Sequence, residues 1–260
     1  MKDKNNLAGI VVILMEIVCC VVFIYAGFQL YSIFKDYKAA SDEYNSLAEE
    51  VLSEGISVYV SAHMDDNEGA EEKKFTYEVD LKGLKEKNPD TVGWIILPDT
   101  KISYPIVKSK DNTDYLKTTF EGKRASSGAI FMDMYCEADF SSQNTIIYGH
   151  NMKNGSMFRA LNNMTDKDYF NKHKVFYIDS GNGFEAYEVI SCYATVETDL
   201  SSWRISFADG ADYGKWLADV SKRCSYNCMP YDENKNTLTL STCRGKSGGT
   251  GRFIVHLQKQ

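Results

Sequence analysis

The chain has 260 residues and a formal net charge of −7, with 43% hydrophobic and 25% charged residues. This length fits one domain of about 150–200 residues plus an anchoring segment. The acidic balance argues against a nucleic-acid partner, which would need a basic stripe on the protein surface. Four prolines in the whole chain exclude a long proline-rich linker.

The N-terminus carries a predicted membrane anchor. A short flank, residues 1–6, precedes the apolar segment 7–30, LAGIVVILMEIVCCVVFIYAGFQL, whose single charged residue is Glu16. As a helix this segment would be about 36 Å long, enough to cross the ~30 Å hydrocarbon core of a bilayer. No clear A-x-A cleavage site follows, so we expect an uncleaved, single-pass anchor in the cell membrane. The flanking lysines are balanced, and a short N-terminus before a long domain favours a cytoplasmic N-terminus and an extracellular globular domain.

Two regions follow the anchor. Residues 31–74 are polar and helix-prone, and they predict a helical stalk with a solvated face, followed by a flexible acidic stretch around His63. Residues 75–260 form the predicted globular domain. Its β-rich runs are 93–97, 102–107, 128–132, 144–149, 174–178, 184–194, 236–243 and 252–257.

Helices are predicted at 81–88, 156–161 and 211–223 of this domain. Eight short β-rich runs with few long helices predict a mainly β fold with peripheral helices, as an antiparallel or mixed barrel or sandwich. No glycine-rich phosphate loop follows any strand-like run, so nucleotide binding has no support.

Seven cysteines leave at least one thiol unpaired. Cys224 and Cys228 are four residues apart, a spacing that would let them pair or bind a metal. No second Cys/His pair has zinc-finger spacing. Cys136 and Cys192 each lie in or beside a strand-like run, so we expect them to be buried rather than bridged.

The last two strand-like runs predict a cysteine beside an arginine. Cys243 ends the first run, the glycine-rich segment RGKSGGTG follows, and Arg252 begins the second run. If the runs pair as a hairpin, with strands ~4.8 Å apart, the two side chains converge. A guanidinium favours the reactive thiolate, and its N–H groups can stabilise an oxyanion. The alternatives are a buried structural cysteine and a solvated arginine.

His150 is the best candidate to complete a Cys–His system. It follows the run 144–149 and opens the loop HNMKNGSMF, where a strand end would hold it rigidly. His63 lies in the stalk, and His173 lies in a polar turn. His256 would be ~13 Å along the strand from Arg252 at ~3.3 Å per residue, too far for the same site. The alternative for His150 is a surface histidine without a catalytic role.

Four ordered segments, and Arg252 nine residues after the last of them, resemble the sortases, and class B most closely. The segments are GWIILPDTKISYPIV, GAIFMD, NTIIYGHNM and TLSTC (239–243). The resemblance covers residues 75–260, and the N-terminal anchor agrees with it. It implies an eight-stranded β-barrel with peripheral helices. It also implies a cysteine transpeptidase whose catalytic residues are Cys243, His150 and Arg252.

The resemblance implies further positions with less specific motifs. Asn112, Leu116, Ser241 and Arg244 correspond to substrate-binding residues, and the Arg244 backbone N–H takes the place of a second oxyanion donor. The segment 196–224 resembles the class B insertion that walls the substrate groove. No metal and no cofactor are implied.

The implied partners are surface proteins with a C-terminal sorting signal of the NPxTx type, and a peptidoglycan precursor whose amino group accepts the cleaved protein. Three alternatives stay open at this point. They are a pilin-polymerising sortase that uses a pilin lysine as acceptor, a hydrolytic cysteine protease, and a membrane-tethered binding module without activity.

Overall fold

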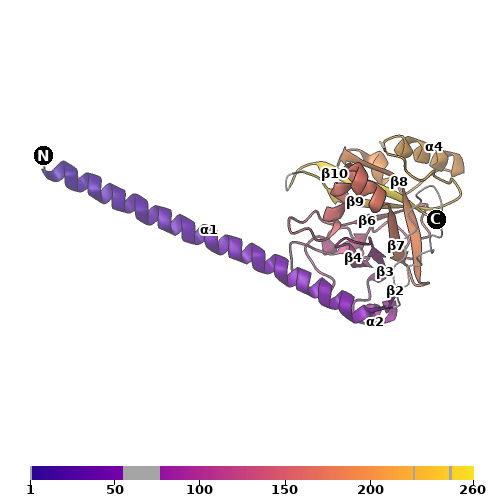
Figure 1. Ribbon diagram of the computed structural model, residues 1–260, viewed down its shortest axis with the longest axis horizontal. Helices are drawn as coiled ribbons and strands as arrows, with labels where there is room; N and C mark the ends of the chain where they lie inside the picture. The colour runs from indigo at the N-terminus through magenta and orange to yellow at the C-terminus, as the bar shows by residue number, and fades with distance from the viewer. Residues whose placement is uncertain (1, 55–76, 225, 246–247) are drawn as a thin grey trace, which may run out of the picture.

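The computed structural model describes residues 2–54, 77–224, 226–245 and 248–260, with side chains described from residue 12 to 52 and again from residue 77. It shows one long helix followed by a globular domain, and Figure 1 shows the N-terminal part of that helix extending far from the domain. The acidic stretch around His63, predicted to be flexible, lies outside the described residues.

The helix α1 (Lys2–Val51) contains the predicted anchor and runs on without a break into the predicted stalk. Within the described residues it is the one helix long and apolar enough to cross a membrane, with a mean hydropathy of 2.2 in an 18-residue window of Val12–Val51 that is 0% buried. The C-terminal end of α1 packs against the globular domain, whereas the sequence predicted a stalk with a solvated face. Ala40, Tyr44, Leu47 and Val51 are buried, since their spacing of three or four residues places them on one helical face.

Eight strands form a closed barrel in the order β10-β8-β7-β3-β4-β5-β6-β9, which confirms the predicted eight-stranded barrel. The pairs β4–β5 and β6–β9 are parallel, and the other six are antiparallel. The strands are β3 (Thr91–Ile96), β4 (Ser103–Val107), β5 (Ile130–Met132), β6 (Asn144–Tyr148), β7 (Val175–Asp179), β8 (Phe184–Val196), β9 (Thr237–Cys243) and β10 (Gly251–Lys259).

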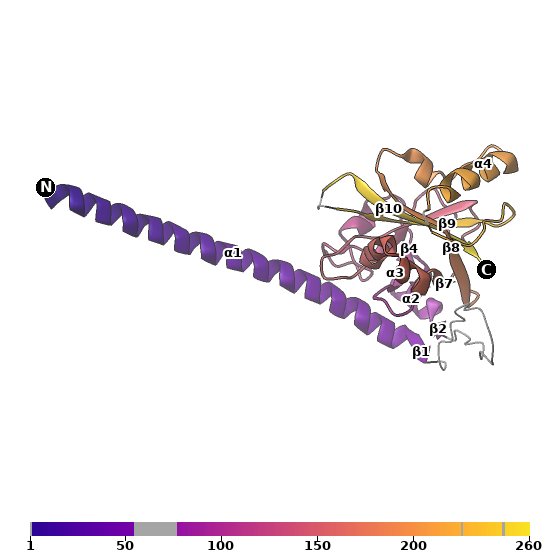
Figure 2. The ribbon, with the colours of Figure 1, turned by 45° about the horizontal axis from the view of Figure 1, so that its top comes forward.

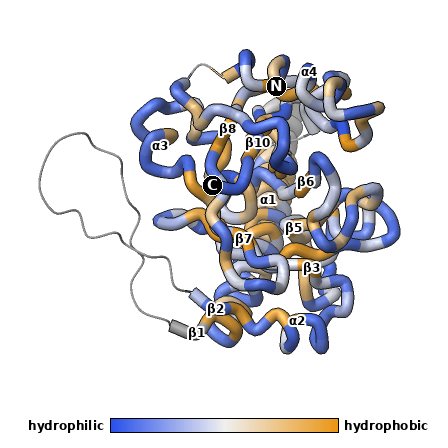
Figure 3. Tube along the Cα trace, turned by 90° about the vertical axis from the view of Figure 1, so that its right-hand side faces the viewer, coloured by the Kyte–Doolittle hydropathy of each residue, from blue (hydrophilic) through white to orange (hydrophobic). Residues whose placement is uncertain are grey.

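A separate ribbon of β1 (Leu52–Glu54) and β2 (Tyr77–Val79) joins the end of α1 to the domain. Figure 3 shows hydrophobic residues concentrated along the strands and hydrophilic residues on the surrounding loops.

The peripheral helices are α2 (Leu81–Lys87), η1 (Asp114–Leu116), η2 (Phe158–Thr165), α3 (Lys167–Lys172), η3 (Leu200–Trp203) and α4 (Gly210–Ser221). The sequence pattern did not predict η1, α3 or η3. The prediction that His173 lies in a polar turn needs correction, because His173 caps α3, which Asp166 begins by accepting a hydrogen bond from the Tyr169 N–H. The His173 ring lies against Tyr169, with centroids 4.2 Å apart.

The helix α4 covers the outer face of β8 and β10, as Figure 2 shows. Its side chains form a second core with strand residues; this core comprises Ile190, Tyr193, Tyr213, Trp216, Leu217, Val220 and Ile254. His256 lies in the same layer and is 0% exposed. Its Nε2 lies 2.9 Å from the Tyr193 hydroxyl and its Nδ1 2.8 Å from Thr239 Oγ1. Both faces of this part of the barrel are therefore buried, and His256 is structural.

Candidate active site

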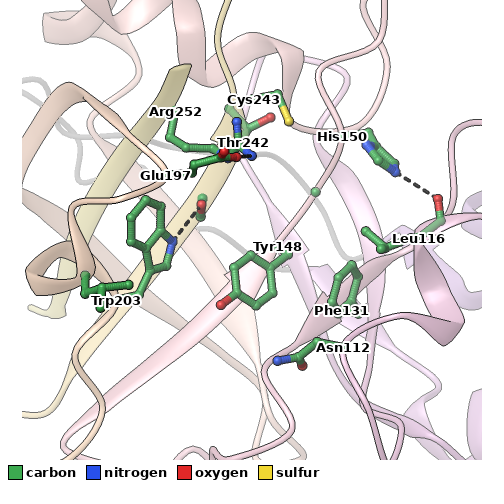
Figure 4. Close-up of a pocket in the computed structure, with 13 residues that line it drawn as sticks. Asn112, Leu116, Phe131, Tyr148, His150, Glu197, Trp203, Thr242, Cys243 and Arg252 are labelled. Carbon is green, nitrogen blue, oxygen red and sulfur yellow. Dashed lines mark hydrogen bonds and ion pairs between the residues drawn. The ribbon is translucent and has the colours of Figure 1, made fainter. Parts of the chain in front are cut away.

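Three neighbouring strands bring the predicted catalytic residues to one edge of the barrel. In the antiparallel ladder of β9 and β10, Cys243 and Arg252 are direct partners, which confirms the predicted hairpin. In the parallel ladder of β6 and β9, Tyr148 is the partner of Ser241. His150 and Cys243 each lie two residues beyond these partners, so both emerge at the same end of neighbouring strands. Figure 4 shows the Cys243 sulfur and the His150 ring at the same rim of a pocket.

The guanidinium of Arg252 is held by three acceptors. Its Nη2 donates to Glu197 Oε2 at 2.6 Å, and its Nη1 donates to the carbonyls of Gly249 and Gly251, both at 2.9 Å. Glu197 is itself tied to the hairpin loop, since its N–H donates to the Thr250 carbonyl at 2.8 Å. Glu197 was not among the predicted site residues, and its only local signal is its place shortly after the β-rich run 184–194.

His150 is fixed from two sides. Its Nε2 lies 2.8 Å from the Leu116 carbonyl oxygen, and its own carbonyl accepts the Phe158 N–H at 2.9 Å. A carbonyl oxygen can only accept, so Nε2 carries the proton of that hydrogen bond. The neutral ring therefore leaves Nδ1 as the nitrogen that can take up or release a proton.

A cavity of about 420 Å³ opens between these strands and the loops around them. Of the four predicted substrate-binding residues, Asn112, Leu116 and Ser241 line it, and Arg244 does not. Glu197 is the one carboxylate among its described lining residues. The full lining is Asn112, Leu116, Phe131, Tyr148, Gly149, His150, Glu197, Leu200, Trp203, Ser241, Thr242, Cys243 and Arg252.

Arg244 does not fit the role that the resemblance implied. Its backbone N–H, expected to face an oxyanion, donates to the Gly251 carbonyl at 2.8 Å, because the hairpin ladder continues one residue past Cys243. Its guanidinium lies over the ring of Phe253, 5.5 Å from the centroid. The structure therefore leaves neither part of Arg244 directed at the cavity.

The floor of the cavity is built around a buried carboxylate. Asp133, 4% exposed, accepts hydrogen bonds from Asn112 Nδ2, the Tyr148 hydroxyl and the Tyr135 N–H, each at 2.9 Å. Asn112 Oδ1 also accepts the Met134 N–H at 2.8 Å. Burial and the charge of Asp133 raise the pKa of Tyr148 well above its usual range, so the Tyr148 hydroxyl stays protonated. Asn112 is thereby held rigidly at the cavity.

One wall of the cavity comes from the segment 196–224, as the resemblance implied. Glu197, Leu200 and Trp203 of this segment line the cavity. Trp203 Nε1 donates to Ser241 Oγ at 3.0 Å, a bond drawn in Figure 4 that ties the wall to the cysteine strand. Leu200 is 78% exposed and so presents an apolar surface at the mouth of the cavity.

Asp199 fixes the start of this wall. Burial raises its pKa, but hydrogen bonds and the charge of Arg223 outweigh burial, so the Asp199 pKa lies far below its usual range. Arg223 Nη1 donates to Asp199 Oδ2 at 2.6 Å. The hydroxyl donors to this carboxylate are Thr195, Ser201 and Ser202.

All seven cysteines lie within the described residues and are free thiols. Cys192 and Cys224 bring their sulfurs within 3.9 Å of each other on the barrel side of α4. Cys136 is buried, and burial raises the pKa of its thiol to about 11. Among the described residues, no group of three or more His, Cys, Asp or Glu side chains is placed to hold a metal ion.

Known proteins of one family are similar to this chain over most of its length. The family model of the sortase domain matches residues 95–260. The chain belongs to the sortase family. The Sortase B of Listeria monocytogenes is 33% identical over 226 residues, which is 86% of this chain and 89% of the relative.

Two solved class B sortases have the same fold. The Staphylococcus aureus sortase B-substrate complex is 32% identical with a TM-score of 0.65, covering 69% of this chain and 84% of that one. The crystal structure of sortase B from B. anthracis in complex with AAEK1 is 29% identical with a TM-score of 0.71, covering 87% and 99%. This chain is therefore a sortase of class B.

Proposed function

We propose that this sortase is a cysteine transpeptidase that cleaves an NPxTx-type sorting signal after its threonine. It then transfers the cleaved protein to an amino group of a peptidoglycan precursor. The observation that carries the proposal is the convergence of Cys243, His150 and Arg252 at the ends of three neighbouring strands, on the rim of one cavity. The S. aureus relative was solved as a complex with its substrate, and its likeness supports a peptide in the corresponding groove.

In the first half of the reaction the Cys243 thiol gives its proton to His150 Nδ1, and the resulting thiolate attacks the threonine carbonyl of the signal. Negative charge develops on the carbonyl oxygen, and the Arg252 guanidinium stabilises it. This is feasible because a guanidinium has more N–H donors than the three acceptors that Arg252 contacts. The C–N bond then breaks, and the leaving amine takes a proton from His150.

In the second half an amine attacks the thioester on Cys243. His150 accepts the proton from the attacking nitrogen, through Nδ1 because Nε2 is committed to the Leu116 carbonyl. The C–S bond breaks, the new amide is released, and the thiol is regenerated. The thioester conserves the energy of the cleaved amide, so no nucleotide is consumed.

The cavity lining supports a binding role for Asn112, Leu116 and Ser241. Leu116 and the exposed Leu200 supply apolar surface, whereas Asn112 supplies a fixed amide. The apolar half of α1 is proposed as a single-pass anchor with a cytoplasmic N-terminus, which would place the barrel outside the cell among surface-protein substrates.

Intact-mass measurement tests the proposal. A soluble form beginning near Tyr31 is mixed with a panel of sorting-signal peptides, with and without an amine acceptor. We expect an acyl adduct on Cys243 with NPxTx peptides, and an amine-dependent amide product. Cys243→Ala should abolish the adduct, whereas Cys136→Ala should retain it. An adduct on another cysteine, or product that forms equally without amine, would refute transpeptidation by Cys243.

A further inference from the structure

The C-terminal end of α1 is part of the globular domain. Figures 1 and 2 both show this end of the helix lying alongside the barrel, while its N-terminal part extends away. Tyr44 is 4% exposed, and its ring meets that of Tyr104 edge-on with centroids 5.2 Å apart. Glu43, 7% exposed, is a buried carboxylate on the same stretch of helix.

Three side chains of α1 make four hydrogen bonds to the backbone of the 116–128 segment. The Tyr44 hydroxyl donates to the Gly128 carbonyl at 2.8 Å and accepts the Phe120 N–H at 3.2 Å. Glu43 Oε1 accepts the Glu121 N–H at 3.1 Å. Asp36 Oδ2, two turns earlier, accepts the Ser126 N–H at 3.2 Å. These bonds join residues 76 to 90 positions apart, so they depend on docking of the helix.

The same segment holds the candidate catalytic histidine at its other end. The Leu116 carbonyl accepts from His150 Nε2. Gly128 packs directly beneath that carbonyl, since a Cβ at Gly128 would lie 2.8 Å from the Leu116 oxygen and 2.3 Å from the Tyr115 oxygen. The Ala129 N–H also donates to Tyr115 at 3.0 Å. A shift of Gly128 must therefore move the oxygen that holds His150.

We propose that Tyr44 is a positioning residue for His150, acting through Gly128 and the Leu116 carbonyl. The helix that carries the proposed anchor thus also sets the orientation of the imidazole. This inference rests on the proposed role of His150 in proton transfer. It predicts that loss of the Tyr44 hydroxyl slows the chemical step rather than peptide binding, because Tyr44 itself lies outside the cavity lining.

The test compares Tyr44→Phe with Tyr213→Phe in the detergent-solubilised full chain. Tyr213 is a matched control. It is 2% exposed, and its hydroxyl forms hydrogen bonds with Thr237 and Lys235, whose own hydrogen-bond partners lie outside the 116–128 segment. Three quantities are measured. They are kcat and KM for a sorting-signal peptide, and the rate at which diethyl pyrocarbonate modifies His150, mapped by mass spectrometry.

We expect Tyr44→Phe to lower kcat about three- to tenfold with KM within about twofold, and to speed His150 modification by a similar factor, because small displacements of catalytic groups are costly. Tyr213→Phe should change none of these three quantities, even at an equal loss of thermal stability. Equal effects in the two variants, or no effect in Tyr44→Phe, would overturn the inference.

Two further measurements keep the test decisive. If Tyr44→Phe does not fold, Glu43→Gln weakens the neighbouring contact to Glu121 and should produce the same pattern at smaller size; an unchanged His150 modification rate there would overturn the inference. If the wild-type chain forms no adduct on Cys243, the proposed function fails, while the modification rates still decide whether Tyr44 controls His150.

Discussion

Arg252 and Cys243 are direct partners across the β9–β10 ladder. This register places Arg252 opposite Cys243 on the neighbouring strand, and the salt bridge from Glu197 fixes where the Arg252 guanidinium lies. The hydrogen bonds to the Gly249 and Gly251 carbonyls complete its fixation by the hairpin loop. The arginine is thus held in place without a bound substrate, as its proposed role in oxyanion stabilisation requires.

Replacing this guanidinium should impair the chemical step. We expect Arg252→Lys to lower kcat/KM about 10²- to 10³-fold, since a lysine cannot reproduce the planar fork of donors. Steady-state kinetics with a sorting-signal peptide measures the loss. Arg204→Lys, which alters an ion pair with Asp212 away from the cavity, should stay near wild type. A loss seen only in KM would assign Arg252 to peptide binding instead.

The carboxylate of Glu197 should have a smaller effect. Glu197→Gln keeps an acceptor for Arg252 but removes the charge, and the Glu197 side chain is 47% exposed, so solvent screening limits the loss. We expect kcat/KM to fall about three- to tenfold. The difference in kcat/KM between wild type and variant should become smaller at high salt, because salt screens the charge of Glu197. Glu185→Gln, which disrupts a surface pair with Lys259, is the control. A gap that does not respond to salt would contradict an electrostatic role.

His256 should make the fold sensitive to acid. Burial, with the nearby charge of Arg223, lowers the pKa of His256 to about 3, whereas an unfolded histidine titrates near 6.5. Between these values the unfolded chain binds one more proton, so the free energy of unfolding falls as pH falls, by at most ~1.4 kcal/mol per pH unit from this group.

Urea titrations at a series of pH values measure how the free energy of unfolding depends on pH. His256→Gln, which lacks a titrating ring, should lose less stability than wild type between pH 6 and pH 4, on the order of 1 kcal/mol per unit less. His173→Gln, at a half-buried site outside this layer, should keep the wild-type slope. Identical slopes in all three proteins would show that His256 is not held neutral.

Cys192 and Cys224 should form a disulfide when a disulfide oxidant such as oxidised glutathione is supplied. Hydrogen bonds from the Cys192 and Cys228 thiols lower the pKa of Cys224, which favours its thiolate as the attacking group. It would displace one thiol from the oxidant, and Cys192 would then displace the second. The new bond should stabilise the domain by ~2–4 kcal/mol.

Peptide mapping of a Cys243→Ala protein, whose candidate nucleophile is removed, detects this link. The intact mass should fall by about 2 Da as two thiol hydrogens are lost. Cys192→Ser should prevent the Cys192–Cys224 link, and Cys136→Ser should not affect it. Pairing of Cys224 with Cys228 alone, at any oxidant concentration, would contradict the assignment.

Local patterns predicted much of this molecule. The alternation in TLSTC, the glycine-rich loop and the position of Arg252 predicted the hairpin, because partners close in sequence are paired by turn geometry. The Arg244 amide was expected to face an oxyanion, but it donates to the Gly251 carbonyl in the hairpin ladder. Whether the ladder ends at Cys243 or one residue later depends on the loop conformation, which residue types alone do not specify.

The amino-acid sequence by itself determined the β-rich domain, the apolar helix and the residue types of the site, since these depend on periodicity and composition over short windows. Only the tertiary structure decided how distant parts meet. Three contacts join residues dozens of positions apart. They are the parallel pairing of Tyr148 with Ser241, the salt bridge between Glu197 and Arg252, and the hydrogen bond from Tyr44 to Gly128. Such contacts arise from closing a barrel and docking a helix on it, so no local pattern of side chains encodes them.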